Sequence, residues 1–356
     1  MNTSAPETQP MEAGNTHNAA ADTQASAAVL RRIEGLHVSR AIYVAAKLGI
    51  ADLLAHGPRT AVELAQLTGT HAPSLYRILR LLGALDVFRE QPTGHFAITP
   101  LGERLQTRVP GSLRHLAMVI DDMGELRPFG RILDTVLSGE PGMKLASGEG
   151  WIEYLLARPA LASSFQAAMS ERTAALASCL AATYGFSQMR HVVDVGGGRG
   201  TLLAAVLTAR PDLRGTLFDL PQVVAGSAEM LQAAGLADRC VTCGGDFFVT
   251  VPPAGDGYIL ANVLHDWDDD RSIVILRNCR QAIHADGKVL VVEKMIFDNL
   301  ERSIPTLRSD INMLVLTGGK ERTTDEYARL FAGADMRLTR VLPLAHPYGI
   351  FEGTPA

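Results

Sequence analysis

A glycine-rich turn set between two apolar segments constrains the fold of this chain most. The apolar run Val192-Val-Asp-Val195 leads into Gly196-Gly-Gly-Arg-Gly200, and a helical stretch starts at Thr201. Glycines in a strand-to-helix turn let the backbone bend tightly and approach a bound nucleotide without a Cβ clash. The turn therefore predicts a nucleotide-binding unit of the α/β type.

From His191 onward, strand-like and helix-like segments alternate. Such alternation is typical of a doubly wound α/β sheet, and we expect this Rossmann-like domain to span residues 186–356. The β-rich runs lie at 192–195, 215–219, 257–261 and 289–293, and the helical stretches at 200–209, 222–235 and 271–285.

The spacing of glycines and acids around the turn narrows the type of cofactor. Counted from Gly196, the sixth position is Thr201, so the third glycine of a GxGxxG pattern comes one residue early. Asp194, two residues before the first glycine, can order the loop. Asp219, at the end of the second strand, can accept hydrogen bonds from both ribose hydroxyls. The pattern suits a cofactor without a pyrophosphate, but the acid is shared with nicotinamide sites, so a dehydrogenase remains an alternative.

Upstream of this domain, residues 29–110 carry the pattern of a winged helix. The pattern consists of helix, turn, helix and a two-stranded wing. Its parts are a helical stripe over 29–48, a capping box at Thr60 and Glu63, a helix over 73–82 and strand-like runs at 87–90 and 94–99. Residues 1–28 show no apolar periodicity, so we expect a mobile tail there.

A winged helix raises the question of DNA binding. The second helix carries only Arg77 and Arg80 among its leucines, whereas duplex binding needs many cations. We therefore expect this helix to pack in a subunit or domain interface, with a cofactor-sensing DNA regulator as an alternative.

Length, charge and cysteine usage exclude several classes of protein. The 356 residues favour two domains over a single core. A net charge of −5 gives no overall drive toward nucleic acid or anionic membranes, and no run approaches the roughly 20 apolar residues of a membrane span. No basic-then-apolar leader precedes Arg31, which indicates a cytoplasmic protein. Four cysteines are too few for a disulfide framework.

Three further motifs follow the predicted strands in order. They are Gly244-Gly-Asp-Phe247, Val263-Leu-His-Asp-Trp-Asp-Asp269 and Gly318-Gly-Lys-Glu-Arg322. Together with the glycine turn and Phe218-Asp-Leu-Pro221, they resemble the S-adenosylmethionine-dependent O-methyltransferases of the plant caffeate/isoflavone and bacterial aromatic-polyketide type. The resemblance covers roughly residues 30–350.

The resemblance implies a domain organisation and a reaction. A Rossmann-like methyltransferase domain would follow an N-terminal all-α winged-helix dimerisation domain, with residues 111–185 as a helical linker that contributes to the acceptor pocket. The protein would be a homodimer, which the apolar N-terminal helices also favour. S-adenosyl-L-methionine would donate a methyl group to a hydroxyl of a small aromatic acceptor and leave as S-adenosyl-L-homocysteine. Some relatives of this architecture instead perform hydroxylation, decarboxylation or rearrangement, which remains the alternative.

The resemblance also implies roles for individual residues. His265 would be the general base, flanked by Glu293 and Glu321. The cofactor would contact Gly196, Gly198, Asp219, Asp246, Phe247, Thr173 and Ala261, the last of which replaces a lysine common in plant members. The acceptor would contact Phe165, Met169, Trp267, Asp310 and Met313.

This chemistry explains why carboxylates should flank the histidine. A phenol titrates near pH 10 and a free histidine near 6.5, so complete proton transfer to an unassisted imidazole would cost about 5 kcal/mol. A neighbouring carboxylate favours the imidazolium and orients the ring. The acid run from Asp266 to Asp270 precedes a predicted helix, where acids suit the helix dipole. We therefore expect a mechanism that needs no metal.

Overall fold

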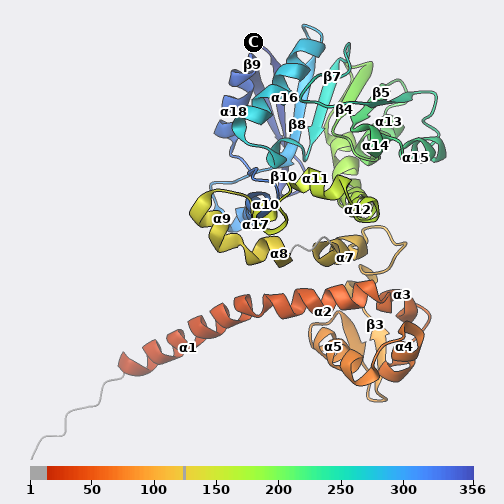
Figure 1. The fold of residues 1–356 in the computed structure, drawn as a ribbon, viewed down its shortest axis with the longest axis vertical. Helices are drawn as coiled ribbons and strands as arrows, with labels where there is room; N and C mark the ends of the chain where they lie inside the picture. Colours follow the sequence, from red (N-terminus) through yellow and green to blue (C-terminus); the bar gives the residue numbers. More distant parts are fainter. Residues whose placement is uncertain (1–13, 123–125) are drawn as a thin grey trace, which may run out of the picture. The chain divides into compact units, whose positions relative to one another are not determined.

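The computed structural model describes residues 14–122 and 126–356. The chain divides into two compact units, Met1–Gln106 and Thr107–Ala356 (Figure 1). The predicted boundary after residue 110 lies just beyond this division. Residues 111–185, which we predicted to be a helical linker, fall in the second unit together with the large sheet.

The first unit combines helices with a small antiparallel sheet of order β1-β3-β2. The predicted order of helix, helix and wing is confirmed, and β1 adds a strand that we did not predict. The elements are α1 (Gly14–Ile33), α2 (Gly35–Lys47), α3 (Ile50–Leu54), β1 (Arg59–Thr60), α4 (Ala61–Thr68), α5 (Ala72–Ala84), β2 (Phe88–Glu90), β3 (His95–Ile98) and α6 (Pro100–Glu103).

Local sequence signals explain how these elements begin and pack. Thr60 Oγ1 accepts a hydrogen bond from the Glu63 amide at 3.2 Å, and the Thr60 amide donates to Glu63 Oε2 at 2.7 Å, so the predicted capping box is confirmed. The helix α5 buries Leu75, Leu79 and Leu82, which recur at helical spacing on one face.

The expectation of an unstructured tail over residues 1–28 is wrong from Gly14 onward, where α1 begins. Six of the 20 residues of α1 are alanine, the best helix former. Alanine favours a helix even where the sequence shows no apolar stripe, which is why the helix was not predicted. Residues 1–13 lie outside the described part of the chain. The end of α1 and the start of α2 leave four large apolar side chains more than half exposed, namely Val29, Leu30, Ile33 and Leu36.

The second unit is built on a seven-stranded mixed sheet of order β6-β5-β4-β7-β8-β10-β9. The first five of these strands pair in parallel, whereas β10 pairs antiparallel with both β8 and β9. The strands are β4 (His191–Val195), β5 (Arg214–Asp219), β6 (Cys240–Gly244), β7 (Gly257–Ala261), β8 (Lys288–Lys294), β9 (Met336–Pro343) and β10 (Tyr348–Pro355).

Helices cover both faces of this sheet (Figure 1). Alternate residues of the central strands point to opposite faces, so Val192 packs with α12 and α13 while Val193 packs with α16 and α18. The helices of this unit are α7 (Arg114–Asp122), α8 (Leu126–Gly130), α9 (Ile132–Ser138), α10 (Gly142–Ser147), α11 (Trp151–Leu156), α12 (Pro159–Thr183), α13 (Thr201–Ala209), α14 (Pro221–Val224), α15 (Ala228–Ala233), η1 (Leu264–Asp266), α16 (Asp269–Ala282), α17 (Leu300–Leu316) and α18 (Thr324–Gly333).

The predicted doubly wound domain is confirmed, and its topology fixes where a ligand can bind. The chain leaves β4 toward β5 on one side and later returns to β7 on the other, so the strand order reverses at β4. Open α/β sheets bind ligands at the carboxyl ends of the strands beside such a switch point. The antiparallel pair β9–β10 was not predicted, because β9 at the sheet edge fully buries only Met336 and glycines interrupt β10.

Among the described residues, no helix is long and apolar enough to cross a membrane.

Candidate active site

The glycine turn lies at the carboxyl end of β4 and folds back on the neighbouring strand ends. Gly196 and Gly198 adopt left-handed backbone angles, with φ of 70° and 59°, and the Gly196 amide donates to the Phe218 carbonyl at 2.8 Å. A Cβ atom on Gly196 would lie 2.8 Å from Val263 Cγ2. Only glycine therefore fits this turn, and the backbone N–H groups are brought close to the end of β7.

Two acids line the turn, the half-buried Asp219 and the buried Asp194. Asp219 Oδ2 accepts a hydrogen bond from the Gly198 amide at 2.8 Å, and Oδ1 accepts one from the Leu220 amide at 2.7 Å. Asp194 packs directly under Gly197, as we expected of a loop-ordering acid, and its Oδ2 has no hydrogen-bond partner among the described residues. Burial, together with the charge of Asp219, raises the pKa of Asp194 to about 7. The pair makes this turn suitable for a ligand with hydroxyl groups and a cationic end.

Aromatic rings form a second wall of this region. The Phe247 ring lies beside the glycine turn, because a Cβ on Gly196 would be 3.7 Å from Phe247 Cε1. Asp246 Oδ1 accepts the Phe248 amide at 2.8 Å and so shapes the same segment. The ring centroid of Trp267, which we predicted to contact the acceptor, lies 6.1 Å from that of Phe247 and 4.7 Å from that of Phe248. The structure thus places Trp267 next to Phe247, which we predicted to contact the cofactor.

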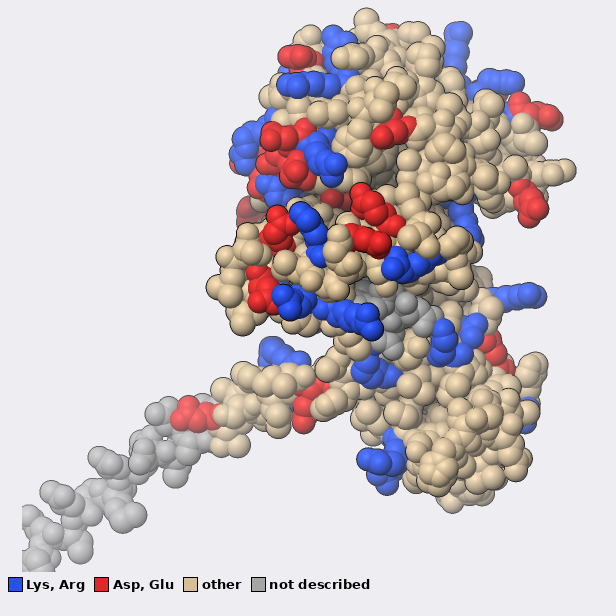
Figure 2. All heavy atoms as spheres, viewed as in Figure 1, with Lys and Arg blue, Asp and Glu red and all other residues tan. Residues whose placement is uncertain are grey.

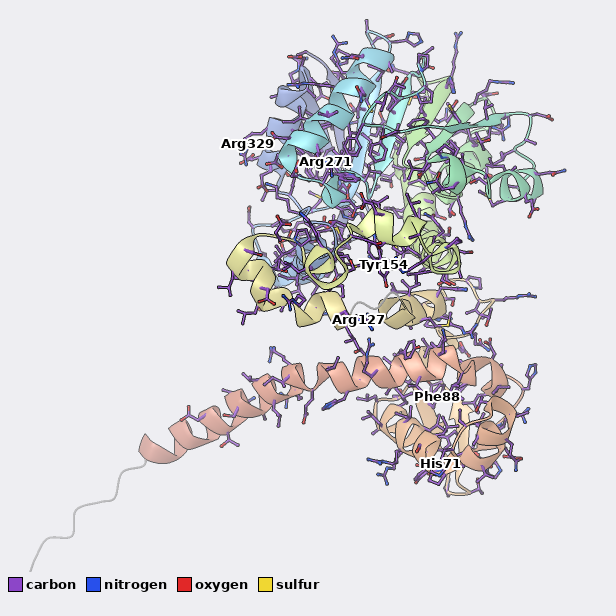
Figure 3. All side chains as sticks on the ribbon, in the orientation of Figure 1. His71, Phe88, Arg127, Tyr154, Arg271 and Arg329 are labelled. Atoms are coloured by element: carbon purple, nitrogen blue, oxygen red, sulfur yellow. The ribbon has the colours of Figure 1, made fainter. Side chains whose placement is uncertain are left out.

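Arg271 closes this aromatic cluster from the side. Its guanidinium lies 4.8 Å from the Trp267 ring centroid and 5.0 Å from that of Phe248 (Figure 3). The first turn of α16 therefore orders the rings through cation–π contacts.

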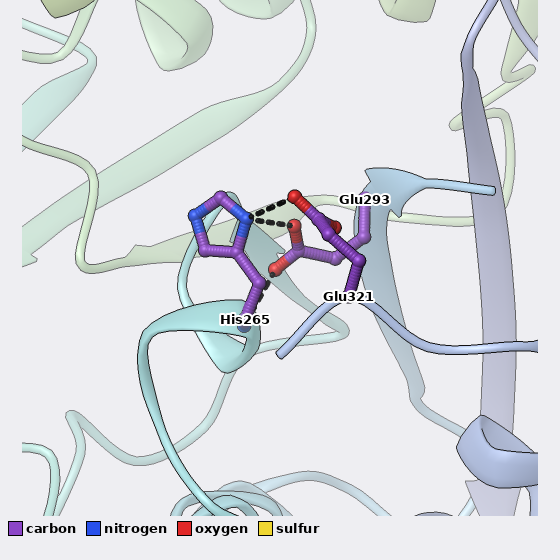
Figure 4. Close-up of side chains that lie close together, drawn as sticks. All are labelled: His265, Glu293 and Glu321. Atoms are coloured by element: carbon purple, nitrogen blue, oxygen red, sulfur yellow. Dashed lines mark hydrogen bonds and ion pairs between the residues drawn. The ribbon is translucent and has the colours of Figure 1, made fainter. Parts of the chain in front are cut away.

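The three residues that we predicted to be catalytic meet in one buried cluster. His265 lies on η1, Glu293 on β8 and Glu321 on the segment between α17 and α18. His265 Nδ1 is 3.1 Å from Glu321 Oε1 and 3.4 Å from Glu293 Oε2, while the other ring nitrogen, Nε2, points away from both acids (Figure 4). The neutral ring that suits this geometry carries its hydrogen on Nδ1 and a lone pair on Nε2.

Glu293 also holds the backbone that carries the histidine. Its Oε1 accepts hydrogen bonds from the amides of Val263, Leu264 and His265 at 2.9, 3.0 and 3.4 Å. The carboxylate is completely buried at the end of β8. One side chain therefore ties the start of η1 to the sheet and places an acid beside the imidazole.

The charged groups of this cluster shift one another's pKa values. Burial opposes a charge on His265, but Glu293, Asp266 and Glu321 outweigh it and raise the pKa of the imidazole to about 9. Burial alone would raise the pKa of Glu321, yet the hydrogen bond and charge of His265, with Lys294, lower it to about 2. Burial raises the pKa of Glu293, and His265 offsets this only in part. The cluster thus favours a proton on the histidine.

Sequence reasoning missed two basic residues that complete the cluster. Lys294 Nζ lies 3.0 Å from Glu321 Oε1, whereas the basic residues adjacent to Glu321 in the sequence are Lys320 and Arg322. Arg322 is instead completely buried and pairs with Asp269 at 2.9 Å. It also donates to the Leu264 and Trp267 carbonyls at 2.9 and 2.7 Å. No local signal distinguishes these roles, because they depend on contacts far away in sequence.

The acid run after His265 divides among three tasks. Asp268 caps α16 by accepting the Arg271 amide at 2.8 Å, as we predicted for the run as a whole. Asp269 pairs with Lys320 and Arg322. Asp266 faces the imidazole, because its Oδ1 lies 3.9 Å from His265 Nε2, on the side opposite the glutamates.

The spacing of His265, Glu293 and Glu321 would also allow a metal ion, since their ligand atoms lie within 4.8 Å of one another. Their existing partners argue against one. Glu293 Oε1 is occupied by backbone amides, and the Lys294 ammonium already balances Glu321. The amides and the ammonium already compensate part of the negative charge of the two glutamates, so a metal-independent site remains our prediction.

The predicted acceptor residues on α12 lie in one apolar cluster. Phe165 and Met169 pack against a group that also contains Val119, Met143, Trp151, Leu155 and Ala168. The Phe165 and Trp151 rings meet edge to face at 5.5 Å. Gln166 on the same helix approaches the glycine turn, because a Cβ on Gly198 would lie 3.1 Å from its Oε1. One helix therefore spans the apolar cluster and the cofactor turn.

The remaining predicted residues occupy different positions. Asp310 on α17 accepts the Glu321 amide at 2.8 Å through Oδ1, so it supports the catalytic cluster, and Met313 lies one turn further along α17. Thr173 follows Met169 by one turn of α12 and is half-buried. Ala261 ends β7 and packs against the apolar core, which leaves no polar group there for a cofactor.

A cavity of about 230 Å³ opens beside the apolar cluster and shares Met143 with it. Its wall includes Arg127 and Tyr154, which are labelled in Figure 3, and Arg158, which stacks on Tyr154 at 3.6 Å. On the face of the second unit shown in Figure 2, acidic and basic side chains of the described residues are intermixed. Such intermixing does not favour a nucleic-acid groove on this face.

Two family models match the chain. The O-methyltransferase domain matches residues 129–337, and the O-methyltransferase dimerisation domain matches residues 30–108. The phenazine O-methyltransferase PhzM of Lysobacter antibioticus is 42% identical over 95% of this chain and 99% of its own length.

Other relatives extend the comparison to a bound cofactor and to nitrogen acceptors. A crystal structure of an O-methyltransferase from neocarzinostatin biosynthesis, in complex with S-adenosylmethionine and 2-hydroxy-5-methyl naphthoic acid, has a TM-score of 0.79. It is 36% identical and covers 89% of this chain and 96% of that chain. The 8-amino-8-demethylriboflavin N,N-dimethyltransferase of Streptomyces davaonensis is 33% identical over 89% of this chain and 92% of its own length.

The close approach of Gly319 to the backbone of His265 leads to a first prediction. A Cβ atom on Gly319 would lie 2.0 Å from the His265 carbonyl oxygen and 2.7 Å from the Trp267 amide nitrogen. Gly319→Ala should therefore displace η1 and lower methyl transfer by about 10²-fold. Gly130→Ala is the matched control, because nothing lies within 4 Å of its added Cβ. Equal activity of the two variants would contradict the packing described here.

The hydrogen bonds of Asp219 lead to a second prediction, for cofactor binding. Asp219→Asn replaces one acceptor oxygen with an amide group that faces a backbone N–H. Loss of a charged hydrogen bond should weaken S-adenosylhomocysteine binding by about 10- to 100-fold in calorimetry. The exposed Asp212→Asn provides a control with the same change of charge. An unchanged dissociation constant for Asp219→Asn would refute the assignment.

Proposed function

Since this chain belongs to the O-methyltransferase family and is an S-adenosylmethionine-dependent methyltransferase, we propose that it methylates a hydroxyl group of a small aromatic acceptor, with His265 as general base. The observation that carries this proposal is the position of His265 Nδ1 between Glu321 and Glu293, with Nε2 on the opposite side of the ring. That arrangement leaves one nitrogen to accept a proton and gives the resulting imidazolium two anionic partners.

The cofactor contributes an activated methyl group on a positively charged sulfur. Asp219 would bind its ribose hydroxyls, the glycine turn its amino-acid end, and Phe247 with Trp267 its adenine. The buried oxygen of Asp194, which has no hydrogen-bond partner among the described residues, supports a cationic amino group at this turn. These residues therefore fit S-adenosylmethionine, and the remaining task of the protein is to orient and deprotonate the acceptor.

The electrostatics of the cluster support proton transfer from a phenol. With a pKa of about 9, His265 lies within about one unit of an ordinary phenol near 10. The cost of complete proton transfer then falls from about 5 kcal/mol for an unassisted imidazole to about 1.4 kcal/mol. The glutamates thus remove most of the free-energy cost of proton transfer from the phenol to the imidazole.

The apolar cluster around Phe165 and Met169 supports an aromatic acceptor. Flat rings bury well among methionine and aromatic side chains, which adapt to different shapes. Two of the relatives reported above act on a phenazine or are bound to a naphthoic acid, both of which are fused aromatic systems.

A nitrogen acceptor is the second candidate, because one relative is an N,N-dimethyltransferase. A neutral amine attacks through its own lone pair, so it needs no base before methyl transfer. The alternative of hydroxylation, decarboxylation or rearrangement is disfavoured by membership of the methyltransferase family, and release of S-adenosylhomocysteine would exclude it.

Replacement of His265 tests the proposal. His265→Ala should lower turnover by about 10²- to 10⁴-fold while S-adenosylhomocysteine still binds. The base must be neutral to accept a proton, so wild-type kcat/KM should rise with pH up to about 9, where His265 loses its proton. His265→Ala should lack this rise. Activity of the variant at the wild-type level would favour a nitrogen acceptor or remove the base assignment.

We also propose that the protein is a homodimer through its first unit. The match to a dimerisation domain and the exposed Val29, Leu30, Ile33 and Leu36 support this assembly. Light scattering at micromolar concentration should give twice the 38.2 kDa mass of the chain. Replacing Ile33 and Leu36 with aspartate should shift the mass toward the monomer, and a monomeric wild-type protein would contradict the proposal.

A further inference from the structure

Lys294 is a buried cation within the catalytic cluster that no part of the proposed reaction uses. Its side chain is only 6% exposed at the end of β8, immediately after Glu293. Nζ donates to Ser309 Oγ at 2.8 Å, lies 3.0 Å from Glu321 Oε1 and faces the Tyr348 ring at 5.5 Å. A buried ammonium is costly unless it is paired, so its partner defines its role.

The decisive contact is a shared oxygen atom. Glu321 Oε1 is contacted both by Lys294 Nζ, at 3.0 Å, and by His265 Nδ1, at 3.1 Å. The ammonium and the imidazolium therefore draw on the same negative charge. Glu321 cannot stabilise the protonated histidine fully while Lys294 is present.

A count of the surrounding charges shows how much this matters. Three carboxylates face the imidazole, those of Asp266, Glu293 and Glu321, and Lys294 provides the nearby cation. Arg322 is committed to Asp269 and to backbone carbonyls. The other titratable groups packed around the cluster are Asp310 on α17, which accepts the Glu321 amide, and the buried Tyr327 on α18. Among the described residues, no other Lys or Arg forms an ion pair with these three acids, so without Lys294 the imidazolium would meet them with no cation paired to any of them.

We propose that Lys294 is a positioning residue that limits how tightly His265 holds its proton. Lys294 keeps Glu321 ionised and oriented, and through the shared oxygen it weakens the hold of that acid on the imidazolium. His265 can then return to its neutral form between turnovers. This inference deepens the proposed function, because it matters for catalysis only if His265 is the base.

The test is a titration of His265 that requires no acceptor. In protein labelled with ¹³C at histidine Cε1 and saturated with S-adenosylhomocysteine, the His265 resonance is identified by its absence from His265→Asn. Lys294→Gln removes the charge but keeps a hydrogen-bond donor, and it should raise the midpoint of the His265 titration by about 1–3 pH units. Lys294→Arg keeps the charge and should leave the midpoint near that of the wild type.

Matched measurements separate this inference from a structural role and from the proposed function. Lys294→Met also removes the charge, so it should raise the midpoint of the His265 titration as Lys294→Gln does. If Lys294→Met does not fold, the result for Lys294→Gln decides the test. A wild-type midpoint in folded Lys294→Gln would overturn the inference. A shift of the midpoint combined with full activity of His265→Ala would instead leave the inference intact and refute the assignment of His265 as base.

Discussion

The carboxylate of Glu293 is the interaction on which the candidate site depends. One of its oxygens receives three backbone N–H groups of the segment that carries His265, and the other faces the imidazole. Glu293 lies near the end of β8 with no exposed surface, so His265 is held from a completely buried position of the sheet. Loss of this side chain would remove both the support of η1 and one of the three carboxylates that face the imidazole. Glu293 therefore supports both the local fold and the proposed chemistry.

A second set of contacts fixes Glu321 from the opposite side. Gly319 packs against the backbone of His265, and Arg322 binds the carbonyls of Leu264 and Trp267. These contacts dock the segment after α17 onto η1, so that Glu321 reaches the histidine although 56 residues separate them in sequence. The imidazole meets Glu293 and Glu321 through Nδ1, which leaves the outer nitrogen of His265 directed toward the acceptor in our proposal. The site is thus assembled from three segments that only the folded sheet brings together.

Patterns in the sequence predicted those features of the fold that depend on interactions between residues close together in the chain. The glycine turn, the capping box at Thr60 and the strands β4, β5, β7 and β8 were all predicted, because steric, hydrogen-bonding and periodic patterns act over a few residues. The partners of the charged residues were not, since Lys320, Glu321 and Arg322 are adjacent in sequence but pair with different elements. The position of Trp267 and the insertion of β10 between β8 and β9 likewise depend on distant contacts. Resemblance to a family supplied the His265 cluster, which composition and spacing alone could not.

The balance of charge around His265 explains why both acids and a cation belong in the cluster. A base that is too weak cannot take a proton from a phenol, and one that is too strong stays protonated and cannot act again. The glutamates move the imidazole toward the acidity of the acceptor, at the expense of its neutral fraction near pH 7. Lys294 acts in the opposite direction through the oxygen that it shares with His265. Efficient turnover then requires that His265 can both take up a proton and release it. A cluster of acids alone would favour only the uptake.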